Sequence, residues 1–148
     1  MNAGKRNLLR ERLIEQMTFI DENRIRFLDT YFPHDRYSYQ EREKYVNFFD
    51  RYVMTVEQMV QQIGETTDST LSKVLIGSEV SLYYAQDDEE DSITICFPEK
   101  ADPDAGNVSF LSPIASQILL CSTNETIQLN TPQGATDVTI REIRFVDW

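Results

Sequence analysis

The chain has 148 residues, an apolar fraction of 41% and a formal net charge of −11, values that fit a folded protein of one ordinary domain or two small ones. No apolar run approaches the ~18 residues that cross a bilayer, and charges interrupt the N-terminal stretch where a signal peptide needs an apolar segment. We therefore expect a cytoplasmic protein without membrane contact. Two cysteines, Cys96 and Cys121, and one histidine, His34, exclude a zinc ribbon and a disulfide framework, and both thiols are predicted to be buried and reduced.

The charge is distributed unevenly along the chain. Residues 1–63 carry ten basic and ten acidic side chains, whereas residues 64–148 carry four and fifteen. Binding to a DNA or RNA backbone needs a basic face that neutralises phosphates, so the overall acidity argues against it. The acidity is compatible with docking on a basic protein surface, or with solubility alone.

The first half of the sequence predicts two amphipathic helices. From Leu8 to about Tyr31 apolar residues recur at helical spacing, and only Arg24 interrupts the stripe. A second and more regular stripe runs to Ile63 and is predicted to be core rather than a ligand site; Gly64 is expected to end this helix. Its principal members are Tyr45, Phe49, Tyr52, Val56, Met59 and Ile63.

The segment "YFPHDRYSYQ" separates these helices. Pro33 prevents one continuous helix, and Ser38 can cap the second one. The sequence therefore predicts an antiparallel helical hairpin. The following "ETTDST", from Glu65 to Thr70, contains no large apolar residue and reads as a linker, which divides the chain into domains of residues 1–68 and 69–148.

Beyond the linker the apolar period becomes two, which predicts strands. The first two strands are joined through the acidic turn "DDEED", and the last two flank the turn "TPQG". One helix, from Ser112 to about Cys121, interrupts the series. The expected strand regions are Val74 to Tyr84, Ile93 to Phe97, Val108 to Phe110, Thr126 to Asn130 and Val138 to Phe145.

The short helix begins abruptly at a Ser-Pro pair. Ser112 suits the N-cap position, and Pro113 suits the first helical position because it lacks the N–H that would be unpaired there. Ile114, Ile118 and Leu119 then supply an apolar face for the sheet. By itself, this pattern indicates a good helix start and no particular function.

The order of the segments resembles the bacterial Gre transcription elongation factors. The second domain of that family carries an acidic "EAD" turn, an "SPIA/SPLG" helix start and a "TPGG"-like turn before a last "Y-x-I-x-x-I" strand. The resemblance covers residues 74–146, and the hairpin matches in architecture. The corresponding residues are Lys100-Ala101-Asp102, Ser112-Pro113-Ile114-Ala115, Thr131-Pro132-Gln133-Gly134 and Val138-Thr139-Ile140-Arg141-Glu142-Ile143.

The resemblance implies an α+β fold in which a coiled-coil hairpin precedes an FKBP-like, mainly antiparallel sheet wrapped on one helix. It also implies RNA polymerase as the partner. Family members dock the second domain on the rim of the polymerase secondary channel, so that two acidic residues at the hairpin tip help to hold the catalytic magnesium and promote cleavage of backtracked RNA. Carried over to this sequence, the docking segment is Leu111, Ser112, Pro113 and Ile114.

The tip of the hairpin departs from the family pattern. Counted back from Met59, the second tip acid falls near Asp35, whereas the first falls near Phe32, which cannot bind a metal. Asp29 is the other candidate acid and is expected a turn before the loop, while Arg36 would compete for any carboxylate. We therefore expect an accessory factor, not an enzyme, that regulates elongation without strong cleavage activity and at most shares a magnesium ion with the polymerase through Asp35.

Two other functions remain open at this stage. The same docking segment would suit an interaction module for another protein partner. An FKBP-like fold also allows a peptidyl-prolyl isomerase, although fold analogy is a weak argument. Proline isomerisation of this kind uses a cleft lined by aromatic side chains. The small C-terminal core needs most of the aromatic residues in that domain, so few remain to line such a cleft. The sequence does not indicate the oligomeric state.

Overall fold

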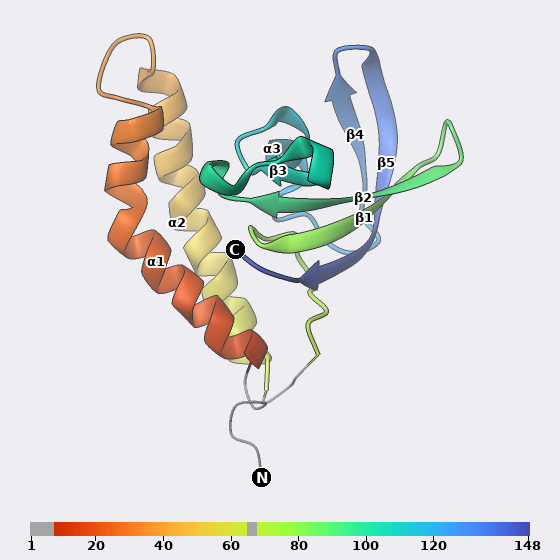
Figure 1. The fold of residues 1–148 in the computed structure, drawn as a ribbon, viewed down its shortest axis with the longest axis horizontal. Helices are drawn as coiled ribbons and strands as arrows, with labels where there is room; N and C mark the ends of the chain where they lie inside the picture. The colour runs from red at the N-terminus through yellow and green to blue at the C-terminus, as the bar shows by residue number, and fades with distance from the viewer. Residues whose placement is uncertain (1–7, 65–67) are drawn as a thin grey trace. The chain divides into compact units, whose positions relative to one another are not determined.

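The chain divides into two compact units, Met1–Asp68 and Ser69–Trp148, and the computed structural model describes residues 8–64 and 68–148 (Figure 1). Residues 65–67 of the expected linker lie outside the described part. The end of that linker belongs to the C-terminal sheet. The Phe145 N–H donates to the Ser69 carbonyl at 2.8 Å, and the Leu71 N–H donates to the Ile143 carbonyl at 2.8 Å.

The N-terminal unit contains two helices of 24 residues each, α1 (Leu8–Tyr31) and α2 (Tyr39–Gln62). Both predicted helices are therefore present. Most of the predicted apolar stripe of α2 is buried, which fits its interpretation as core. The buried residues of α2 are Tyr45, Phe48, Phe49, Tyr52, Val56, Met59 and Val60, and those of α1 include Leu9, Leu13, Ile20 and Leu28.

Ser38 and Gly64, which were expected to cap the start of α2 and to end it, do not play these roles. Ser38 occupies the N-cap position, but its side chain makes no capping hydrogen bond. The Asp35 carboxylate organises the loop instead, because its Oδ1 accepts from the Tyr37 and Ser38 N–H groups at 2.8 Å each. At the other end the cap is Ile63, with extended backbone at φ −81° and ψ 122°. Gly64 therefore provides no left-handed turn.

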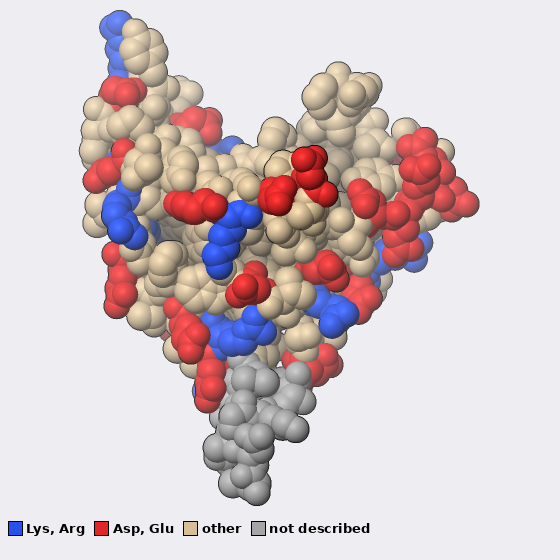
Figure 2. Space-filling model, viewed as in Figure 1, with Lys and Arg blue, Asp and Glu red and all other residues tan. Residues whose placement is uncertain are grey.

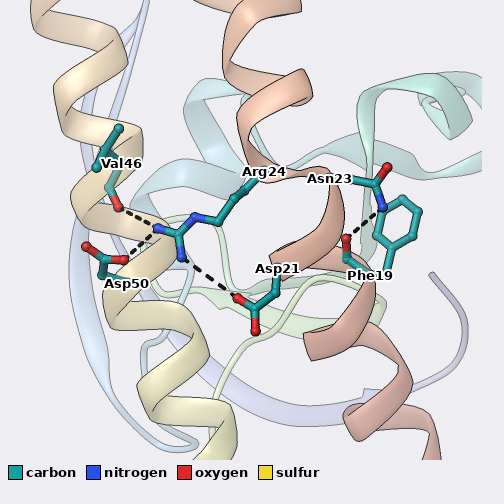
Figure 3. A network of polar contacts seen from close by, with 6 residues as sticks. All are labelled: Phe19, Asp21, Asn23, Arg24, Val46 and Asp50. Carbon is teal, nitrogen blue, oxygen red and sulfur yellow. Dashed lines mark hydrogen bonds and ion pairs between the residues drawn. The ribbon is translucent and has the colours of Figure 1, made fainter.

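Polar side chains join the two helices across the seam. Arg24 interrupts the apolar stripe of α1, and its Nη2 lies 2.6 Å from Asp50 Oδ1 and 3.3 Å from the Val46 carbonyl oxygen on α2 (Figure 3). Deeper in the hairpin, the Tyr52 hydroxyl donates to Gln16 Oε1 at 2.5 Å, and both residues have no exposed surface. These contacts fix how the helices align along their length.

The C-terminal unit is a curled five-stranded sheet with the order β3-β2-β1-β5-β4 (Figure 1). All neighbouring strands are antiparallel except β2 and β3, which pair in parallel. The predicted fold class, a helical hairpin followed by a mainly antiparallel sheet with one helix, is confirmed. The elements are β1 (Ser78–Tyr84), β2 (Glu89–Cys96), β3 (Asn107–Ser109), α3 (Pro113–Ile118), β4 (Thr126–Thr131) and β5 (Gly134–Phe145), with 3-10 turns η2 (Pro98–Lys100) and η3 (Pro103–Ala105).

The first strand begins later than the sequence predicts. Val74 and Ile76 are fully buried but precede β1, because the chain turns at Gly77, whose φ is +91°. That left-handed conformation suits glycine, which has no Cβ. A Cβ on Gly77 would lie only 2.9 Å from the Asp147 carbonyl oxygen. Val74 and Ile76, which the sequence pattern assigned to a strand, are thus buried residues of the segment that bends before β1.

The acidic segment and the helix also have boundaries that differ from the prediction. Part of "DDEED" belongs to β2, which starts at Glu89, and Figure 2 shows acidic side chains gathered over the β1–β2 hairpin. Helix α3 ends at Ile118, three residues before Cys121, because Leu120 adopts a left-handed φ of 67°. The Leu120 N–H then donates to the Val74 carbonyl at 2.8 Å, so a distant segment ends the helix.

The core of the C-terminal unit is apolar and continuous across the sheet. Phe110, Ile140 and Ile143 have no exposed surface, and among the described residues of this unit Ser78 alone is a buried polar side chain. Of the two free cysteines, Cys96 is buried and Cys121 only half-buried, so the prediction of two buried thiols is wrong for Cys121. Burial raises the pKa of the Cys121 thiol, with Glu125 adding to the effect. No helix in the described ranges is long and apolar enough to span a membrane.

Candidate functional site

The Ser-Pro segment, residues 111–114, lies at the surface where β3 leads into α3. Pro113 is exposed, and Leu111, Ser112 and Ile114 are half-buried. The neighbours on either side, Phe110 and Ala115, are fully buried. The segment is therefore a short surface turn between two anchored core residues.

Hydrogen bonds hold this turn in one conformation. Ser112 is the N-cap of α3, as predicted: its Oγ accepts from the Ala115 N–H at 3.4 Å, and its backbone is extended at φ −64° and ψ 153°. Pro113 follows at the first helical position. Upstream, Ser109 Oγ accepts from the Leu111 N–H at 3.1 Å, and the Ser109 carbonyl accepts from the Ser112 N–H at 2.9 Å.

Gln117 fastens the helix behind this turn to the edge of the sheet. Its Nε2 donates to the Asn130 carbonyl at 3.0 Å, and its Oε1 accepts from the Asn130 N–H at 2.8 Å. The same Nε2 lies 2.9 Å from the Pro113 carbonyl oxygen, so the side chain joins both ends of α3 to β4. The sequence offered one weak signal for this role, a lone amide within the apolar run "SPIASQILL".

At the hairpin tip, both candidate acids are already engaged. Asp29 lies on α1, as expected, and its Oδ1 is 2.9 Å from Arg42 Nη1. Asp35 lies in the loop and accepts the two backbone N–H groups described above. Phe32, near which counting along the sequence placed the first tip acid, stacks on Tyr45 with ring centroids 4.8 Å apart. Sequence reasoning missed Arg42, since its partner is thirteen residues away on the other helix.

Arg36 pairs with no carboxylate among the described residues, contrary to the expectation that it would compete for one. Its guanidinium carbon lies 5.1 Å from the centroid of the Tyr37 ring, and its Nη2 donates to the Tyr37 hydroxyl at 3.0 Å. No cluster of three or more metal-binding side chains occurs within residues 8–64 and 68–148. The tip thus presents an arginine on an exposed tyrosine rather than a pair of carboxylates.

Comparison with known families assigns the chain. The model of the C-terminal part of the transcription elongation factors GreA and GreB matches residues 68–145, which is more than half of the chain. The chain belongs to the GreA/GreB family. The match spans the C-terminal unit up to residue 145, including the Ser-Pro segment and Gln117 with its β4 partner Asn130.

Individual relatives agree with this assignment. GreA of Halalkalibacterium halodurans is 30% identical over 99 residues, which cover 66% of this chain and 63% of that protein. GreA of Listeria welshimeri is 32% identical over 98 residues, which cover 65% and 61%. The alignments thus span less than two thirds of the length of these curated relatives.

Solved structures of the same family have a weaker likeness. The Gfh1 protein of Thermus thermophilus matches with a TM-score of 0.44 and 18% identity over 91% of this chain and 89% of that one. A GreA/GreB factor from Nitrosomonas europaea has a TM-score of 0.45 and 23% identity over 57% and 66%. Likeness at these scores carries no functional information.

Proposed function

We propose that this GreA/GreB family member binds RNA polymerase at the rim of the secondary channel and regulates elongation without strongly stimulating transcript cleavage. The docking contact would be the Ser-Pro segment, residues 111–114. The chain would act as an accessory factor, with the hairpin occupying the channel.

The hydrogen-bonded turn of the Ser-Pro segment, with Pro113 at the surface, is the observation that carries this proposal. Pro113 is exposed, while Phe110 and Ala115 on either side are fully buried. Such a turn loses little conformational freedom on binding, which lowers the free-energy cost of association. The half-buried Ile114 supplies apolar surface beside it. The family match includes this segment.

The hairpin tip supports the part of the proposal that concerns cleavage. A magnesium ion shared with the polymerase needs two carboxylates that are oriented toward it rather than held by other partners. Here Asp29 Oδ1 is 2.9 Å from Arg42, Asp35 Oδ1 accepts two backbone N–H groups, and Phe32 has no ligand atom. These residues do not fit a magnesium clamp, so we derive no catalytic step through this ion.

Two assays with purified bacterial core RNA polymerase test the proposal. We expect immobilised polymerase to bind the chain at micromolar concentration or below, and a cleavage-active GreA to compete for the same site. In a backtracked elongation complex, we expect the chain alone to leave the transcript uncut and to slow cleavage by GreA. Absence of binding at micromolar concentration would refute the polymerase proposal and favour an interaction module for another partner.

A further inference from the structure

The hairpin tip contains a hollow that the polymerase proposal does not use. Its volume is about 540 Å³, within the range of roughly 300–1,000 Å³ of small-molecule sites. The lining consists of His34, Asp35, Arg36, Tyr39 and Arg42, all from the loop and the first turn of α2. We propose that this hollow binds the polyphosphate group of a nucleotide. The inference goes beyond the proposed function and does not depend on it.

Arg42 is the fixed cation of the hollow. Its side chain is 12% exposed, and both contacts that hold it use one nitrogen: Nη1 lies 2.9 Å from Asp29 Oδ1 and 3.0 Å from the Phe32 carbonyl oxygen. Within the described residues, Nε and Nη2 have no partner. Because Arg42 lines the hollow, these two donor groups suit phosphate oxygens, whose geometry the planar guanidinium matches.

Arg36 is the second cation and is also oriented in advance. The Tyr37 ring lies beneath it, with 5.1 Å from the guanidinium carbon to the ring centroid. The contact with the Tyr37 hydroxyl uses Nη2, and its other donors have no partner in the described part of the chain. Two guanidinium groups thus line the hollow together with the carboxylate of Asp35, while Asp29 pairs with Arg42. These charges balance, so the guanidinium donors that have no partner in the described part of the chain, rather than a net positive charge, would hold the phosphates.

The backbone at this end of α2 adds to the attraction for an anion. The helix starts at Tyr39, and its N-cap Ser38 gives no side-chain hydrogen bond to the first turn. The N–H groups of residues 40 and 41 precede the first intrahelical bond, from the Arg42 N–H to the Ser38 carbonyl, and so have no partner within the helix; the helix dipole also places partial positive charge there. The overall charge of −11 does not oppose this, because the acidic excess lies in residues 64–148.

An aromatic side chain at the hollow points to a nucleotide rather than a simple phosphate. Tyr39 lines the hollow and is 62% exposed. Tyrosine rings stack on nucleobases with little sequence preference. Figure 2 shows basic atoms at the loop end of the hairpin, where Figure 1 places this turn. The arginines would hold the phosphates, and Tyr39 would pack on the base.

Calorimetric titration of the full chain without polymerase tests this inference. The probes are GTP, ATP, pyrophosphate and guanosine, in EDTA so that no metal ion mediates the contact. We expect both triphosphates and pyrophosphate to bind, the triphosphates more tightly, and guanosine to give no heat. Higher salt should weaken binding because the contacts are charged. No heat from any phosphate at millimolar concentration would overturn the proposal.

Three variants assign the binding to the hollow. Arg36→Ala should weaken triphosphate and pyrophosphate binding about tenfold, the effect of losing a charged hydrogen bond. Tyr39→Leu should weaken triphosphate binding and leave pyrophosphate unchanged. Arg51→Ala, an exposed arginine further along α2, is the matched control and should bind as the parent does.

Backbone NMR shifts give an independent readout of the location. The largest changes on adding pyrophosphate should fall on the amides of residues 39–42. Equal losses of affinity in the Arg36 and Arg51 variants, with scattered shifts, would mean nonspecific charge attraction and would overturn the site. Because polymerase is absent from both experiments, failure here leaves the polymerase proposal standing.

Discussion

The two units of this chain both have an apolar core but differ in what sets the alignment of their elements. The hairpin joins its helices with polar contacts across the seam, among them Arg24 with Asp50 and a fully buried Tyr52 with Gln16. The sheet unit has an apolar core and leaves its charges outside, where acidic side chains predominate. Two helices with an apolar stripe can slide along each other, so polar contacts set their register, whereas strand pairing sets the register of a sheet.

The difference extends to the two candidate contact surfaces. The Ser-Pro segment is held by backbone and side-chain contacts inside one well-packed unit, and Gln117 ties its helix to Asn130 on β4. The hairpin tip is a loop in which Asp35 bonds only to its own neighbours. We therefore expect the sheet unit to bind the partner. Residues of the hairpin tip should tolerate substitutions that alter its binding properties without unfolding the chain.

The largest effect should follow a change in the sheet unit at Gly77. Gly77→Ala forces a side chain into a φ of +91° and places its Cβ 2.9 Å from the Asp147 carbonyl oxygen and from the Trp148 Cβ. We expect the free energy of unfolding to fall by about 2–4 kcal/mol, measured by urea denaturation.

Gly64 provides the matched control for this change. A Cβ there would have no atom of the described residues within 4 Å, so Gly64→Ala should change the free energy of unfolding by less than about 0.5 kcal/mol. Equal effects at the two glycines would contradict the packing described for the Gly77 bend.

A smaller effect is expected from the buried polar pair of the hairpin. Tyr52→Phe removes the donor that Gln16 Oε1 accepts from while keeping the shape of the ring. Leaving a buried acceptor without this donor should lower the free energy of unfolding by about 1–2 kcal/mol. Tyr37→Phe is the control, because Tyr37 is 82% exposed. If Tyr52→Phe is as stable as the parent, polar contacts do not specify the hairpin.

The smallest change in the free energy of unfolding is expected at the two serines in N-cap positions, one in each unit. Ser112 Oγ accepts from the Ala115 N–H at 3.4 Å, whereas Ser38 makes no capping bond. Ser112→Ala should lower the free energy of unfolding by about 0.5–1 kcal/mol, and Ser38→Ala by less than about 0.3 kcal/mol. Thermal melts followed by circular dichroism are sensitive enough to separate the two. The reverse order would contradict the assignment of the caps.

The features that were predictable from the sequence depend on residues close together in the chain. The Ser112-Pro113 helix start, the 24-residue α1 and the β4–β5 hairpin each follow from local spacing and turn chemistry. The ends of elements were missed where a distant segment decides them. Helix α3 ends before Leu120, which is left-handed and bonds to Val74, and no local pattern near Leu120 contains that information.

The candidate site divides in the same way. The surface turn at Pro113 could be predicted from the adjacent residues Ser112 and Pro113. The lack of a metal ligand at Phe32 could be read from the sequence directly, because phenylalanine has no ligand atom. The pairing of Asp29 with Arg42 requires the hairpin to be folded, because the residues lie on different helices. The stacking of Arg36 on Tyr37 involves neighbours, but charge alone suggested a carboxylate partner.

Affinity for core RNA polymerase, measured on variants of the Ser-Pro segment, tests the central claim most directly. Ile114→Asp and Ser112→Glu place charge in the docking segment, and Val146→Asp places it at an apolar residue of the same unit that is 37% exposed. Melting temperatures should be recorded for all three, since the half-buried Ile114 could affect folding.

We expect the Ile114 and Ser112 variants to keep a cooperative melt and to bind polymerase at least about 30-fold more weakly, a loss of 2 kcal/mol or more that is typical of an interface hot spot. Val146→Asp should bind as the parent does. If folded Ser112→Glu and Ile114→Asp proteins both bind polymerase with unchanged affinity, residues 111–114 are not the docking segment and the account is contradicted.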